Sequence, residues 1–416
     1  VNVVRACGRS RGLIVGTTIH ITAIESGFDH IRPDVMLATA LVKMYGECGE
    51  LSLAWIVFSQ SKDLDIVAWN TMIFVFLQNR DLCNAIEAFG MAPDRDCATW
   101  NTIIGGLTQN GHGNMAFKLF CQMNLESIKP NVVTFISVLN AFTSTACLEN
   151  SRLVHMLIVE SGLDRGIEIE NALISTYGRC RDVNDAKSIF ENMQCRNVVS
   201  WTAIVGGWCE SGHFEKALDI FKKMKLHRVP PDKVTLLCAL HACAMLSTLE
   251  EGKEINETIC KLGMEIHSMI QTALIDMYGK CGSVEESRDV FDHSLERTIE
   301  MWNALMTTFS QTGCVNDIRK VFMEMQQDNI MPNHVTFSCV LAACSHSGSV
   351  DDASRAFLSI NTFHGVPHTE DHYLCIVDLF TRTGELEKAE AMVKNLPFQF
   401  DEDLAWQCLL SGCKIH

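Results

Sequence analysis

The chain has 416 residues, of which 47% are hydrophobic, and its 34 basic and 50 acidic residues give a formal net charge of −16. No apolar run approaches the roughly 18 residues of a membrane span, so we expect no membrane partner. The acidic balance disfavours nonspecific nucleic-acid binding, which depends on basic side chains. A solenoid could still combine an acidic outer surface with a locally basic groove. Nineteen cysteines and no secretion signal indicate free thiols in a reducing compartment.

An internal repeat organises the sequence. Trp100, Trp201 and Trp302 are spaced by 101 residues, and Pro130, Pro231 and Pro332 share that interval. Each 101-residue period divides into related repeats of 35, 35 and 31 residues. Residues 1–34 are predicted to be a partial repeat, and residues 35–402 an array of eleven repeats. Their bounds are 35–65, 66–96, 97–131, 132–166, 167–197, 198–232, 233–267, 268–298, 299–333, 334–369 and 370–402.

Each repeat predicts two short amphipathic helices. In repeat 97–131 the first helix contains W-N-T-I-I-G-G-L, a turn follows at Asn110 and Gly111, and the second helix contains A-F-K-L-F before Pro130. Glycines are predicted at the turns between helices: Gly49, Gly111, Gly212, Gly282, Gly313, Gly348 and Gly384. Because each repeat leaves an apolar face for its neighbours, the fold class is all-α, a right-handed α-solenoid superhelix of helix-turn-helix repeats.

The recurring aromatic residues are interpreted as core. A small residue stands four positions before a phenylalanine in the second helices, which places both on one helix face. The pairs are Ala54/Phe58, Ala85/Phe89, Ala116/Phe120, Ala186/Phe190, Ala217/Phe221, Ser287/Phe291 and Ala353/Phe357. Together with the tryptophan triplet they indicate the fold and no function.

The sequence resembles pentatricopeptide repeat proteins, specifically the plant PLS subclass that mixes 35-residue and 31-residue repeats. The motifs that carry the resemblance are V-V-S-W-T-A-I-V, V-T-F-I-S-V-L-N-A-F and N-A-L-I-S-T-Y-G-R-C. The C-terminal H-Y-L-C-I-V-D-L-F-T-R-T-G-E-L and W-Q-C-L-L-S-G-C-K-I-H are similar to the end of such an array, so residues 403–416 would be the start of a truncated E-type extension. Tetratricopeptide repeats, which bind peptides, fit less well because their W-x-x-L-G-x-x-Y word is absent.

Two positions of each repeat carry polar residues that could read a base: the fifth residue, on the first helix, and the last residue. We call them a reading pair. An unstacked RNA base could satisfy such groups. The pairs are Thr39/Asp65, Asn70/Asp96, Asn101/Asn131, Asn171/Asn197, Thr202/Asp232, Thr272/Thr298 and Asn303/Asn333.

Hydrogen-bonding capacity assigns a base to each pair. An ionised aspartate only accepts and suits G or U, whereas asparagine can donate and suits A or C. At the fifth position a short threonine leaves room for a purine and a longer asparagine suits a pyrimidine, and the code that the resemblance implies agrees. Repeats 35–65 to 299–333 should therefore prefer G, U, C, any, C, G, any, purine and C, from the RNA 5′ end. The alternative for the last residue is an ordinary helix N-cap.

Two repeats should act as spacers, because Ile136 and Leu237 occupy their fifth positions and Gly166 and His267 their last. Repeats 334–369, with Ser338 at the fifth position, and 370–402 stay unassigned. At the second position, Val67, Ala98 and Val199 are placed to pack against bases, and Glu168 and Glu300 depart from that pattern.

Arg179, Lys280 and Arg382 recur at the thirteenth position of the 31-type repeats. They could contact phosphates along the bound strand. The alternative is a cation placed favourably near a helix C-terminus.

No catalytic site is expected, and neither a metal nor another cofactor. His368-Thr369-Glu370 matches half of a zinc-deaminase motif, but P-C-x-x-C is absent from the sequence. The resemblance implies a single-stranded RNA-binding adaptor of a mitochondrion or chloroplast. It would select C-to-U editing sites, with editing cofactor proteins or a deaminase supplied in cis or in trans. The alternatives are an RNA stability or splicing factor and a peptide-binding scaffold.

Overall fold

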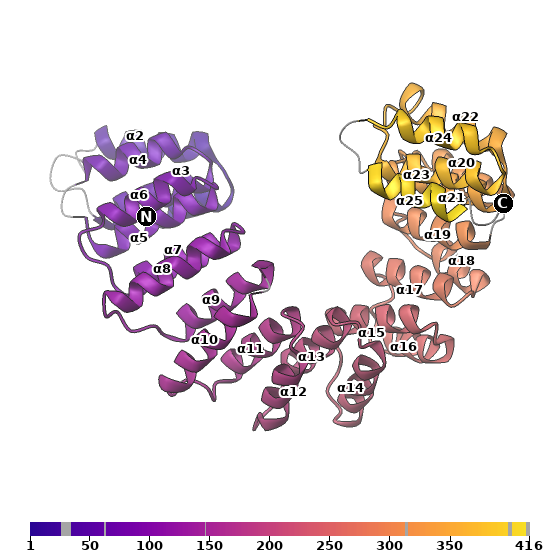
Figure 1. Ribbon diagram of the computed structural model, residues 1–416. Coiled ribbons are helices and arrows are strands. Elements are labelled where there is room, and N and C mark those ends of the chain that lie inside the picture. Colours follow the sequence, from indigo (N-terminus) through magenta and orange to yellow (C-terminus); the bar gives the residue numbers. More distant parts are fainter. Residues whose placement is uncertain (26–34, 62–63, 146, 313–314, 398–401, 413–416) are drawn as a thin grey trace. The chain divides into compact units, whose positions relative to one another are not determined.

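Every regular element in the described part of the chain is an α-helix. The computed structural model describes residues 1–25, 35–61, 64–145, 147–312, 315–397 and 402–412. Within each compact unit, helices alternate in a helix-turn-helix pattern and stack side by side in chain order (Figure 1). Two compact units, Val1–Ser211 and Gly212–His416, each contain such a stack.

The first helices of the eleven repeats begin at the first residue of each repeat. They are α3 (Val35–Glu47), α5 (Ile66–Gln78), α7 (Cys97–Gln109), α9 (Val132–Thr145), α11 (Ile167–Arg179), α13 (Val198–Glu210), α15 (Lys233–Leu246), α17 (Ser268–Lys280), α19 (Ile299–Thr312), α21 (His334–Ser347) and α23 (Glu370–Arg382).

Each first helix is followed by a second helix, which completes the helix pair of its repeat. The second helices are α4 (Leu51–Gln60), α6 (Leu82–Met91), α8 (Gly113–Leu125), α10 (Leu148–Glu160), α12 (Val183–Asn192), α14 (Phe214–Leu226), α16 (Leu249–Lys261), α18 (Val284–Asp292), α20 (Val315–Gln327), α22 (Val350–Thr362) and α24 (Leu386–Lys394). Helices α1 (Asn2–Arg9) and α2 (Leu13–Glu25) precede the array, and α25 (Glu402–Gly412) follows it.

The turn between the two helices of a repeat contains a residue in the left-handed region. Gly111 has φ 81° and Gly282 has φ 77°, a conformation that glycine adopts without steric cost. Arg80 and Arg181 occupy the same turn with φ 62° and 59°, so the turn geometry does not depend on glycine alone. The predicted turn glycine Gly313 lies outside the described residues.

The aromatic residues form the core, as the repeat pattern predicts. The side chains of Ala85, Ala116 and Ala186 are fully buried. Rings from successive repeats meet edge to face: Phe89 on Trp100 at 4.7 Å, Phe190 on Trp201 at 4.9 Å and Phe291 on Trp302 at 4.5 Å between centroids. Phe58 and Trp69 make the same edge-to-face contact at 4.9 Å, so it ties one repeat to the next at four junctions of the described chain.

The closest described backbone approach between two glycines joins α11 to α13. A Cβ atom added to Gly178 would lie 2.7 Å from the Gly207 Cα, closer than side-chain atoms pack. At the equivalent positions of α7 and α9 the chain has Thr108 and Ala141. The residues at the contact between neighbouring first helices therefore differ from repeat to repeat.

The seventeen described cysteines are free thiols, and five of them are buried, so most of them are not core residues. Among the described helices, none combines the length and the apolar character that crossing a bilayer requires.

Candidate nucleic-acid interface

The last residue of six repeats caps the first helix of the next repeat. In each case a side-chain oxygen accepts a hydrogen bond from the backbone N–H of the third residue of that next repeat, at 2.8–3.1 Å. The capping residues are Asp65, Asp96, Asn131, Asn197, Asp232 and Asn333. The N-cap alternative for these residues is therefore correct as a description of the unbound chain.

Capping also orients the side chain, because one polar atom faces the helix N-terminus and the other polar atom is left to contact a ligand. Because the asparagine Oδ1 faces the helix N–H, the remaining donors are on its Nδ2. In Asp96, Oδ1 accepts from the backbone N–H and the hydroxyl of Thr99 at 2.8 and 2.9 Å. A capping aspartate thus presents an acceptor at the place where a capping asparagine presents a donor. Capping and base reading are compatible functions of one residue.

The fifth and last residues are in direct contact in the three Asn–Asn repeats. The fifth-residue Nδ2 donates to the last-residue Oδ1 at 3.1 Å in Asn101/Asn131, at 3.3 Å in Asn171/Asn197 and at 3.1 Å in Asn303/Asn333. The structure therefore brings these predicted pairs together.

A third residue closes the contact in two of those repeats, and the sequence analysis did not assign it a role. The Thr134 hydroxyl donates to Asn101 Oδ1 at 2.6 Å, and the Thr336 hydroxyl donates to Asn303 Oδ1 at 2.7 Å. Both threonines are buried. In the sequence, Thr134, Thr235 and Thr336 recur at intervals of 101 residues, which could have drawn attention to this position. The recurrence alone does not show which groups these threonines contact.

The other reading pairs are arranged differently. Hydroxyls of the fifth-position threonines Thr39, Thr202 and Thr272 donate to carbonyls of their own helices, at 2.7–2.9 Å. The Asn70 Oδ1 is buried without a hydrogen-bond partner in the described structure. Thr202 and Asp232 belong to different compact units. Thr298 ends its repeat before α19.

The two predicted spacer repeats end without a side-chain cap. Gly166 precedes α11 and His267 precedes α17, and neither helix has a side-chain hydrogen bond from its N-cap residue. Ile136 and Leu237, at the fifth positions, are partly buried. In the unassigned repeat 334–369, the Ser338 hydroxyl donates to the His334 carbonyl.

An exposed apolar side chain stands at the second position of most repeats, next to the reading pairs. Val67 and Val199 are 57% and 55% exposed, and Ala98 is exposed. Met36 and Met269 of two other reading repeats are equally exposed, and so are Val133 and Val234 of the two predicted spacer repeats, each at 55–61%. Glu168 and Glu300 interrupt this apolar pattern. A hydrogen bond from its own backbone lowers the pKa of Glu300, so this carboxylate stays charged.

The three candidate phosphate contacts lie in the last turns of α11, α17 and α23. Each is beside a carboxylate: Arg179 and Glu210 at 3.9 Å, Lys280 and Asp276 at 2.9 Å, Arg382 and Asp378 at 2.8 Å. Their positions fit the helix C-terminus alternative. A phosphate would have to compete with these carboxylates.

Packing and helix-capping contacts engage the histidines at and near the His368-Thr369-Glu370 segment. The His368 ring stacks on Phe357 at 4.3 Å, and His372 Nε2 donates to the His334 carbonyl at 2.8 Å while Nδ1 accepts from the Thr369 N–H. Burial lowers the pKa of both imidazoles. Among the described residues, no group of three His, Cys, Asp or Glu side chains could hold a metal ion.

Comparison with known proteins identifies the repeat. The PPR repeat family model matches residues 95–144, 196–245 and 297–346, and the PPR repeat model matches 171–198 and 272–299. A mitochondrial pentatricopeptide repeat-containing protein of Arabidopsis thaliana is 30% identical over 99% of this chain and 68% of its own length. The chain belongs to the pentatricopeptide repeat family. A chloroplastic relative from the same plant is 33% identical over the whole chain and 47% of its own length.

Solved structures show the same fold. The crystal structure of the pentatricopeptide repeat protein PPR10 from maize matches 99% of this chain and 65% of its own with a TM-score of 0.63 at 16% identity. PPR10 in complex with an 18-nt psaJ RNA element matches with a TM-score of 0.52 at 19% identity. This chain spans about half the length of the first curated relatives it matches.

Proposed function

We propose that this pentatricopeptide repeat chain binds single-stranded RNA in a sequence-specific manner through its reading pairs. The observation that carries the proposal is the repeated association of an oriented cap with an exposed apolar neighbour. The cap presents either a donor or an acceptor, and the apolar side chain at the second position offers a surface for a base to pack on. Maize PPR10, whose fold is similar, has been crystallised with an RNA element.

The cap geometry explains why aspartate and asparagine would select different bases. G and U carry a donor on the ring nitrogen of the Watson–Crick edge, and A and C carry an acceptor there. The outward acceptor of a capping aspartate complements the former, and the outward Nδ2 of a capping asparagine complements the latter. The order G, U, C, any, C, G, any, purine, C follows for repeats 35–65 to 299–333.

The biological setting is part of the proposal. The relatives include chloroplastic and mitochondrial proteins, which supports an organelle. The alternation of 35- and 31-residue repeats and the C-terminal words support the PLS subclass and the start of an E-type extension at residues 403–416. The chain would be an adaptor that selects C-to-U editing sites, with a deaminase or editing cofactor proteins supplied separately. Purified chain with added zinc should then leave cytidine in a bound RNA unchanged.

The decisive test is Asp96→Asn in repeat 66–96. Asparagine caps a helix about as well as aspartate, so the fold and the packing surface should be kept. The change replaces an outward acceptor by a donor. Binding of RNAs that differ only at the second predicted nucleotide should shift its preference from U towards C, by about 1–3 kcal/mol, a magnitude typical of well-made base contacts.

Two controls accompany this test. His267→Asn alters the last residue of a spacer repeat and should leave every nucleotide preference unchanged. Lys280→Ala should weaken all RNAs alike and reduce the salt dependence if Lys280 contacts phosphate. A uniform loss of affinity in Asp96→Asn, or no enrichment of any sequence from a randomised RNA library, would refute base reading at this repeat.

A further inference from the structure

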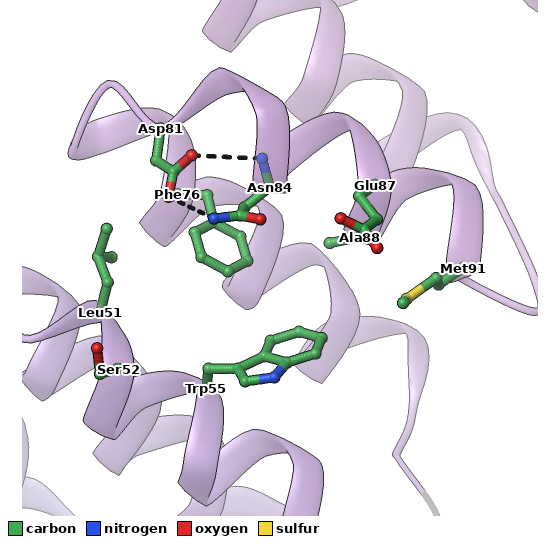
Figure 2. A pocket seen from close by; sticks show the side chains of 9 residues that line it. All are labelled: Leu51, Ser52, Trp55, Phe76, Asp81, Asn84, Glu87, Ala88 and Met91. Carbon is green, nitrogen blue, oxygen red and sulfur yellow. Dashed lines mark hydrogen bonds between the residues drawn. The ribbon is translucent and has the colours of Figure 1, made fainter.

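A pocket opens between the second helices α4 and α6, away from the reading pairs. It has a volume of about 500 Å³, within the range of sites that bury a ligand. Figure 2 shows the Trp55 side chain extending from α4 into the pocket, which Phe76 of α5 also lines. The Trp55 and Phe76 ring centroids are 6.0 Å apart. Aromatic side chains from two helices therefore form one wall of the pocket.

Acidic groups form the opposite wall. Asp81 and Glu87 of α6 line the pocket with Asn84, Ala88 and Met91, and no basic side chain is among the described lining residues. Asp81 caps α6 and accepts from the Asn84 amide at 2.7 Å, as the dashed lines in Figure 2 mark. Glu87 stands six positions after Asp81, which corresponds to a rise of about 9 Å along a helix. Two cationic groups therefore suit these carboxylates better than one.

The indole and the acidic side chains come together at only one position in the described part of the repeat array. Trp55 immediately follows Ala54, the small residue of the second-helix pattern, and Glu87 stands two residues after Ala85. At the position of Trp55 the ten other second helices of the array have Ile86, Phe117, Arg152, Lys187, Leu218, Lys253, Arg288, Arg319, Ser354 and Glu390. Among these helices only α4 has an indole there, and the next second helix, α6, has an acidic N-cap, Asp81, and an acidic residue, Glu87, at the same pocket.

We propose that this pocket binds an arginine-containing basic segment of a partner protein. The guanidinium would pack against the Trp55 indole and pair with the Glu87 carboxylate, and a second basic residue would reach Asp81. Arginine suits this site because its planar, weakly hydrated cation stacks on aromatic rings and pairs with carboxylates. Anionic phosphate is disfavoured by the lining charges. The proposal concerns a different surface from the reading pairs and does not depend on RNA binding.

The test uses the 416-residue chain and the acetylated, amidated peptide Gly-Leu-Arg-Ala-Leu-Arg-Gly. Spectra of the chain labelled with ¹³C at its methionine methyl groups locate the site, because Met91 lines the pocket and its resonance is identified by its loss in Met91→Leu. We expect the peptide to shift the Met91 resonance. The same peptide with both arginines replaced by the uncharged citrulline should not shift it.

Two variants decide the role of the pocket. Trp55→Leu should weaken peptide binding about tenfold through loss of the cation–π contact, and Glu87→Gln should weaken it and reduce its salt dependence. Glu160→Gln, an exposed position on α10, removes the same charge elsewhere and should change nothing. Glu87→Gln keeps the test valid if Trp55→Leu does not fold. Equal binding of the two peptides, or equal effects of Glu87→Gln and Glu160→Gln, would overturn the proposal.

Discussion

Repeats 97–131 and 167–197 carry the same reading pair of asparagines, but their surroundings differ. In the first, the Asn101 Oδ1 accepts from the Thr134 hydroxyl, so both ends of its amide are engaged. In the second, Ser200 stands at the equivalent position and bonds only within its own cap, and the Asn171 Oδ1 has no partner in the described structure. The pair of residues thus does not by itself define the hydrogen-bonding state of a repeat.

The helices that carry these pairs also differ where they meet the next first helix, because α11 and α13 have Gly178 and Gly207 there and α7 and α9 have Thr108 and Ala141. This difference should give the largest measurable effect. Gly178→Ala would push a Cβ against the Gly207 backbone, and we expect it to lower the free energy of unfolding by about 2–3 kcal/mol. Gly105→Ala in α7 is the matched control. A Cβ there would lie 3.5 Å from Ser137 Oγ, an ordinary contact, so the higher helix propensity of alanine should stabilise by up to about 1 kcal/mol.

Denaturant unfolding of the two variants measures both values. If Gly178→Ala is as stable as the parent chain, α11 and α13 can separate without cost and the close approach has no energetic role.

The hydroxyl that closes the Asn101 contact should give a smaller effect. Thr134→Val keeps the shape and removes the hydroxyl, which leaves the Asn101 Oδ1 unpaired, and should cost about 1–2 kcal/mol. A double-mutant cycle with Asn101→Ala should show a coupling energy of about 1 kcal/mol. The corresponding cycle between Ser200→Ala and Asn171→Ala should show almost none. Similar coupling in both repeats would remove the distinction drawn between them.

In repeat 370–402 the third residue is a titratable histidine, His372. His372 occupies the position of Thr134 and accepts the Thr369 N–H through Nδ1, which requires a neutral ring. Burial lowers its pKa in the folded chain. Stability from this group is therefore present above the unfolded histidine pKa and is lost as the pH falls below it. We expect His372→Gln to show a smaller loss of stability between pH 7 and 5 than the parent chain.

This last effect is the smallest of the three, and thermal unfolding across that pH range measures it. An unchanged pH dependence in His372→Gln would show that the imidazole is not held neutral.

The repeat pattern was sufficient to predict two helices in each repeat, because apolar spacing indicates the helices and glycine and proline mark the turns between them. The buried Trp100, Trp201 and Trp302 were predictable for the same reason. The role of Thr134 was not, because its partner Asn101 is 33 residues away on another helix and only packing brings them together. The pocket at Trp55 was missed because its acidic wall comes from the next repeat. The base preferences and phosphate contacts remain predictions.

The edge-to-face contacts of Trp100, Trp201 and Trp302 place one indole at the same junction in three successive periods. Because each indole is buried against the phenylalanine of the preceding repeat, its fluorescence should report the local opening of that junction and little else. Chains that retain one of the three, with the remaining tryptophans replaced by phenylalanine, would allow fraying of the array to be followed one junction at a time during unfolding.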